Sequence, residues 1–102
     1  GVVAPEPLWA EGRVFQGLVV RLAPHIDRDA TLGRLRARGV DCTIGTYAIH
    51  RQSQLAKHCR QSPGGLTGSV LCADSSITLP LWPDMPGATI ERVVESLRGV
   101  IT

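Results

Sequence analysis

The sequence has little of three things that many functional classes need: lysine, paired cysteines and long apolar runs. Lys57 is the only lysine among eleven basic residues. It lies in a polar, helix-like run rather than in the hydrophobic pocket that activates a Schiff-base lysine. No apolar run approaches the roughly 18 residues of a membrane span, and residues 1–5 lack the charged and apolar regions of a signal peptide. We therefore expect no membrane insertion and no secretory leader.

The cysteines and histidines exclude the common disulfide and metal patterns. Cys42, Cys59 and Cys72 are odd in number and more than ten residues apart, which fits neither a disulfide framework nor a CxxC zinc site. His50 and His58 are eight residues apart, which is not a zinc spacing. We expect reduced thiols in a cytoplasmic protein, and no metal ion.

The charge pattern is only mildly basic, with a net charge of +2 and a pI near 8.7. Four arginines cluster in one segment: Arg28, Arg34, Arg36 and Arg38. Aspartates flank this cluster and no aromatic residue interleaves with it, so the pattern favours a solvated helix face. Nucleic-acid binding is the minor alternative, and no nucleic-acid partner is expected.

The length and composition predict one compact domain. The chain has 102 residues, of which 43% are hydrophobic, enough for one domain with a core and too few for two. Residues 1–12 contain prolines and a glycine without periodicity, which predicts an entry linker. Residues 13–102 then form the domain.

Local signals predict the first elements of that domain. Residues 15–22 are rich in β-forming side chains and end before Pro24, which predicts a strand. Asp27 is a suitable N-cap and Gly39 a suitable C′ residue, so we expect a helix between them. Residues 40–46 alternate apolar and polar side chains and predict a second strand.

The later elements follow the same logic. They are a loop with a short helix over 47–60, a turn at 62–65, a short helix over 66–73, a strand over 76–81, and an amphipathic helix from the N-cap Thr89 to Ile101. This order predicts an α+β fold. We expect a two-layer sandwich, in which a small, mostly antiparallel sheet is covered by helices on one face.

One loop carries candidate binding residues. Tyr47, His50, Arg51 and Gln52 follow a predicted strand end, where loops often deliver functional side chains. Their hydrogen-bonding groups suit a polyhydroxylated or carboxylated ligand, although a simple polar loop remains the alternative. No nucleophile–base pair and no phosphate loop is recognisable. We therefore expect no catalytic residue in this chain.

Two stretches carry ordered motifs. Residues 76–85 read SITLPLWPDM and lead into a helix with VVESL, and residues 15–52 run from a VVRL strand through RD and LRARGV to Tyr47 and the His50-Arg51-Gln52 triplet. Their order and spacing resemble the C-terminal small domain of the DegT/DnrJ/StrS sugar aminotransferases over residues 13–101. The chain departs from that pattern at Trp82, where many members carry histidine, and after Gln52, where proline and an aromatic are common.

The resemblance implies a fold-type-I pyridoxal-phosphate enzyme that moves an amino group from an amino acid, with glutamate expected, to a keto-sugar nucleotide. Residues 1–12 would link this domain to a missing N-terminal large domain, which carries the Schiff-base lysine and the cofactor contacts. The fragment alone would bind no cofactor and be inactive. The Tyr47–Gln52 loop would face the substrate, and the full-length enzyme would be a homodimer.

Two alternatives accompany this interpretation. A relative that dehydrates the sugar would differ only in the missing domain. A stand-alone α+β binding or regulatory module would lack catalysis altogether. Such a module should present a polar surface, whereas a detached enzyme domain should expose an apolar patch.

Overall fold

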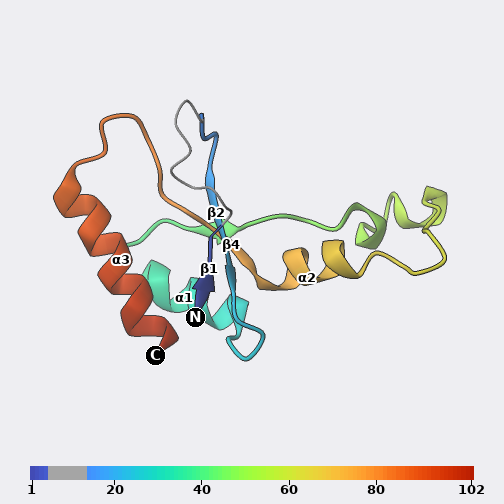
Figure 1. The fold of residues 1–102 in the computed structure, drawn as a ribbon, viewed down its shortest axis with the longest axis horizontal. Coiled ribbons are helices and arrows are strands. Elements are labelled where there is room, and N and C mark those ends of the chain that lie inside the picture. The colour runs from blue at the N-terminus through green and yellow to red at the C-terminus, as the bar shows by residue number, and fades with distance from the viewer. Residues whose placement is uncertain (5–13) are drawn as a thin grey trace.

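A computed structural model describes residues 1–4 and 14–102. The strands β1 (Val2–Val3), β2 (Leu18–Leu22), β3 (Thr43–Ile44) and β4 (Ser76–Leu79) form one antiparallel sheet in the order β1-β2-β4-β3. The helices are α1 (Arg28–Ala37), α2 (Thr67–Ser75) and α3 (Gly87–Ile101), with two 3₁₀ turns, η1 (Ile49–Arg51) and η2 (Ala56–His58). The predicted α+β class and antiparallel sheet are confirmed (Figure 1).

The core lies on one face of the sheet. Alternate residues of β2 and β4 point to this face because side chains alternate along a strand, and Val20 is paired with Ile77 across the ladder. The helices α1 and α3 supply the opposing layer through buried leucines such as Leu35, which is fully buried, and Leu97. Figure 1 shows α3 on one side of the sheet and α2 extending to the other.

The first residues pair with the sheet, which the sequence did not predict. Val2 pairs with Leu22 and Val3 with Arg21, so β1 forms an edge strand rather than part of an aperiodic segment. Sequence patterning missed it because two residues are too few to show alternation. The rest of the predicted linker, residues 5–12, lies outside the described residues, and the domain boundary at residue 13 stays a prediction.

Helix α1 begins and ends where its capping residues predicted. The Asp27 side chain accepts a hydrogen bond from the Ala30 backbone nitrogen at 2.8 Å. At the other end Gly39 has φ +77°, and the Val40 nitrogen donates to the Leu35 carbonyl at 3.0 Å. This pattern is a Schellman motif, in which glycine takes the left-handed position.

The start of α3 differs from the prediction. The helix begins at Gly87 with Pro86 as its N-cap, so Thr89 lies inside the first turn rather than before it. The Pro86 carbonyl accepts hydrogen bonds from the nitrogens of Thr89 and Ile90, at 3.0 and 3.1 Å. The helix therefore has no side-chain cap, whereas the sequence predicted one from Thr89.

A projecting arm, residues 47–66, elongates the molecule. It runs away from the sheet through η1 and η2 and returns into α2 (Figure 1). The radius of gyration is 15.4 Å, compared with roughly 13 Å for a compact domain of this size. The predicted turn at 62–65 is present, because the Gly65 nitrogen donates to the Ser62 carbonyl at 2.8 Å. The predicted short helix in 47–60 is instead two 3₁₀ turns, and the predicted strand over 40–46 shortens to β3.

Two arginines of the cluster form hydrogen bonds with backbone carbonyls of α3, which a fully solvated helix face would not do. Arg34 donates to the carbonyl of Val100 at 3.4 Å, and Arg38 to that of Ser96 at 3.3 Å. These bonds join α1 to the last turns of α3, where cations favour the negative end of the helix dipole. The guanidinium groups thus contribute to the packing of the two helices.

Candidate functional site

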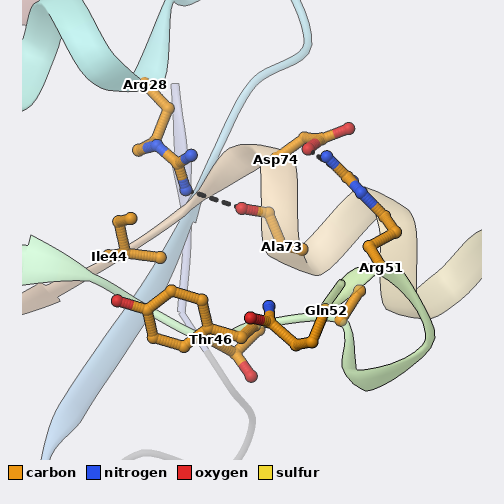
Figure 2. A pocket seen from close by; sticks show the side chains of 9 residues that line it. Arg28, Ile44, Thr46, Arg51, Gln52, Ala73 and Asp74 are labelled. Atoms are coloured by element: carbon orange, nitrogen blue, oxygen red, sulfur yellow. Dashed lines mark hydrogen bonds and ion pairs between the residues drawn. The ribbon is translucent and has the colours of Figure 1, made fainter. Parts of the chain in front are cut away.

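A cleft of about 180 Å³ opens where β3, the arm and the end of α2 meet (Figure 2). Charged, polar and apolar residues line it: Arg28, Ile44, Thr46, Tyr47, Ala48, Arg51, Gln52, Ala73 and Asp74. Three of the four residues that the sequence proposed, Tyr47, Arg51 and Gln52, lie in this cleft.

A small buried residue positions the loop. Ala48 is only 3% exposed, whereas its neighbours Tyr47 and Ile49 are 66% and 65% exposed. The Ala48 carbonyl accepts a hydrogen bond from the Arg51 nitrogen at 3.0 Å, which starts η1. The backbone is therefore anchored at Ala48 while the flanking side chains remain open to solvent.

Arg28 forms the fixed wall of the cleft. Its side chain is 12% exposed, and its Nη1 donates to the carbonyls of Ala73 at 2.6 Å and Ser76 at 3.4 Å. Figure 2 shows this side chain extending from α1 to the last turn of α2. A cation there gives a partner to the Ala73 carbonyl in the last turn of α2 and complements the negative end of that helix. Sequence reasoning did not assign Arg28 to the site.

An ion pair lies on the side of the cleft opposite Arg28. Arg51 Nη1 lies 2.8 Å from Asp74 Oδ1, with the two side chains 48% and 55% exposed. The pair joins η1 on the arm to α2 (Figure 2). An ion pair this exposed contributes at most about 1 kcal/mol to stability. Asp74 was not among the predicted site residues.

His50 lies in a different cleft from Arg51 and Gln52. It lines a second cleft of about 310 Å³ together with Tyr47, Cys59 and Arg60. Successive residues of a 3₁₀ turn point about a third of a revolution apart, so His50 and Arg51 diverge although they are adjacent. Tyr47 borders both clefts. The loop over Tyr47–Gln52 therefore contributes side chains to both clefts.

The described residues do not fit a lysine-bound pyridoxal phosphate. Lys57 is exposed in η2 and lines neither cleft. Within residues 1–4 and 14–102, no group of three His, Cys, Asp or Glu side chains could hold a metal ion. No helix in that part of the chain is both long and apolar enough to cross a membrane.

The three cysteines are free and differ in exposure. Cys42 is buried, Cys59 is partly buried and Cys72 is exposed. Burial raises the pKa of the Cys42 thiol, and the Asp41 carboxylate adds to that rise while Arg36 opposes it. Cys42 is therefore an inert core thiol rather than a nucleophile.

An apolar groove of about 420 Å³ opens on the second face of the sheet. Val3, Val19 and Cys72 are among its lining residues, and Val3 is 54% exposed. Val19 alternates with the core residues of β2, which places it on the face opposite α1 and α3.

Comparisons with known proteins agree on one family and fold. A family model of the DegT/DnrJ/EryC1/StrS aminotransferase family matches residues 2–98 of this sequence. A solved DegT DnrJ EryC1 StrS aminotransferase from Brucella abortus is similar, with a TM-score of 0.80 and 24% sequence identity. That likeness shows a shared fold. It covers 98% of this chain and 26% of the Brucella protein, so the chain spans about a quarter of the length of that enzyme.

Proposed function

This chain belongs to the DegT/DnrJ/EryC1/StrS aminotransferase family, and we propose that it is the small domain of a longer pyridoxal-phosphate-dependent sugar aminotransferase. The whole enzyme moves an amino group from an amino acid, with glutamate as donor, to a keto-sugar nucleotide. The observation that carries the proposal is the family match across residues 2–98. The overlap with only 26% of the Brucella enzyme supports a longer functional protein.

In this proposal the chemistry resides outside the chain. Pyridoxal phosphate supplies the electron sink for amino transfer when it is bound. A large N-terminal domain holds it, because Lys57 is exposed and lies in neither cleft. The 102-residue chain alone binds no cofactor and is inactive. The enzyme acts in the cytoplasm, which agrees with its free thiols.

The cleft supplies contacts for the substrate. The Tyr47 hydroxyl and the Gln52 amide can donate to and accept from sugar hydroxyl groups. Arg28 holds the wall of the cleft in place through its bond to the Ala73 carbonyl. His50 approaches from the second cleft, with Tyr47 between the two. These residues bind and orient the substrate and do not themselves carry out the reaction.

The apolar groove serves as a domain interface. Val3 and Val19 expose apolar surface on the sheet face opposite the core, and such surfaces mark sites of association. Its occupant in this proposal is the large domain of the same chain, and two full-length chains form a homodimer. A stand-alone regulatory module would instead have a polar surface here.

Amino transfer by the full-length protein tests the proposal. The purified holoenzyme is incubated with glutamate and a panel of keto-sugar nucleotides, and 2-oxoglutarate and amino-sugar nucleotide are measured. Wild-type protein should form both products. No transfer with any acceptor contradicts the aminotransferase assignment, and loss of a sugar hydroxyl without amination identifies a dehydratase.

Loop variants test the placement of the substrate. Tyr47→Phe and Gln52→Ala each remove hydrogen bonds worth about 1 kcal/mol, so the KM for the sugar nucleotide should rise about 3- to 10-fold. The matched control is Gln54→Ala, because Gln54 is exposed on the same arm and lines neither cleft. Equal kinetics for Gln52→Ala and Gln54→Ala would remove Gln52 from the site.

A further inference from the structure

The Arg51–Asp74 pair lies on the rim of the proposed substrate cleft. The two charged groups meet at 2.8 Å, and each side chain is about half exposed, at 48% and 55%. Exposed ion pairs add little to stability, because water solvates both charges when they separate. The pair can therefore open when another anion offers Arg51 a better partner.

Arg51 is the arginine of this cleft that a ligand can use. The Arg28 side chain is 12% exposed, and its Nη1 is bound to the Ala73 carbonyl at 2.6 Å. Arg51 uses only Nη1 in its bond to Asp74 within the described part of the chain. A guanidinium carries five N–H donors in a fork that matches carboxylate and phosphate oxygens. Its remaining donors can thus receive such a group.

Asp74 is the fixed member of the pair. It lies in the last turn of α2, next to Ala73, whose carbonyl is bound by Arg28. Arg51 lies in η1, a single 3₁₀ turn on the projecting arm. An incoming anion therefore competes with a carboxylate that α2 holds in place.

Resting on the proposed function, we propose that Arg51 binds an anionic oxygen group of a substrate and that Asp74 competes with it, which sets the affinity of the cleft. The diphosphate of the sugar nucleotide and the carboxylate of the amino donor share this chemistry. Competition predicts that neutralising the two residues has opposite effects. A purely structural ion pair predicts the same effect from both changes, because either one breaks the pair.

The test uses the full-length holoenzyme and varies each substrate separately. Arg51→Gln should raise the KM of the anionic substrate about tenfold, because a charge-assisted contact is lost. Asp74→Asn should lower that KM about two- to fivefold, because the competing carboxylate is gone. The matched control is Arg98→Gln, which neutralises an exposed arginine of α3 outside the cleft. Far-UV circular dichroism confirms that each variant is folded.

A second readout identifies the anion. Titration calorimetry with the free nucleoside diphosphate should show weaker binding to Arg51→Gln and tighter binding to Asp74→Asn if the diphosphate is the ligand. Opposite shifts confined to the KM of glutamate assign the carboxylate instead. Shifts in the same direction, or none in either substrate, overturn the inference while leaving an active wild-type enzyme and the proposed function intact. An inactive wild-type enzyme contradicts the proposed function itself.

Discussion

Among the glycines that the structure describes, Gly45 is the one where an added methyl group meets the closest fixed neighbours. It follows β3, and its nitrogen donates to the Ser76 carbonyl at 3.0 Å. A Cβ at this position would lie 2.6 Å from Ser76 Cβ and 2.8 Å from Val19 Cγ1, and closer still to Ser76 Oγ. Carbon atoms in contact normally lie about 3.5–4.0 Å apart. Gly45→Ala therefore forces β3, or both neighbouring side chains, to move by roughly 1 Å.

The neighbours of Gly45 cannot yield easily. Ser76 is 3% exposed, and its hydroxyl donates to the Cys72 carbonyl at 2.5 Å. Overpacking of this kind costs about 1–3 kcal/mol. For a domain of about 100 residues, 2 kcal/mol corresponds to a fall in Tm of roughly 8–16 °C. Thermal unfolding followed by circular dichroism, with urea titration for the free energy, measures the change.

The same substitution at Gly33 is the matched control, with the opposite expected sign. Gly33 lies within α1, is exposed, and has no atom within 4 Å of an added Cβ. Alanine there should stabilise the protein by about 0.5–1 kcal/mol, because it restricts the unfolded chain and favours the helix. A Tm for Gly45→Ala equal to or above that of wild type would refute the close packing of β3 against Ser76.

Three further predictions concern the first cap, the core thiol and the second cleft. Asp27→Ala should lower the free energy of unfolding by about 1 kcal/mol, because the Ala30 nitrogen loses its acceptor. Asp27→Asn should keep most of the wild-type stability, and urea titrations measure both variants. In the isolated 102-residue chain, Cys72 should react with a thiol reagent at pH 8 faster than Cys42, because Cys72 is exposed and burial keeps the Cys42 thiol protonated. Equal rates in peptide mass mapping would contradict the burial of Cys42. His50→Ala in the full-length enzyme should impair turnover or raise the substrate KM about 3- to 10-fold, the scale of one lost hydrogen bond, without changing the Tm. Unchanged steady-state kinetics would make the loop structural at that position.

Local signals carried the fold predictions that are confirmed. Asp27 and Gly39 mark the ends of α1 because capping acts within about four residues of the chain. The strand β4 starts at Ser76 as predicted but ends at Leu79, before the predicted end at residue 81, because Pro80 cannot donate to a ladder. Such features depend on the neighbouring sequence alone.

Features that depend on distant partners could not be predicted. The strand β1 exists because Val2 finds Leu22 across the sheet, and two residues carry no periodic pattern. The close approach at Gly45 depends on Ser76, which a single sequence does not connect to it. The predicted start of α3 was wrong because the helix begins at Gly87 with Pro86 as its N-cap, so Thr89 lies inside the first turn and no side chain caps the helix.

Some residues of the candidate site were likewise recognisable from the local sequence, whereas others depend on contacts with distant residues. The polar residues between Tyr47 and Gln52 were recognisable as a cluster that follows a strand. Arg28 and Asp74 enter the cleft through contacts with Ala73 and Arg51 that span 45 and 23 residues of sequence. The separation of His50 from Arg51 depends on the 3₁₀ geometry of η1, which residue types alone did not indicate.

The central claim is that this chain contributes a substrate-facing cleft to an aminotransferase and not its chemistry. The most direct test is a crystal structure of the full-length protein with the amino-sugar nucleotide product bound. The account predicts product atoms within hydrogen-bonding distance of Tyr47, Arg51 or Gln52, and a cofactor lysine outside the 102 residues. A product bound without contact to these residues, or a cofactor linked to Lys57, would contradict it.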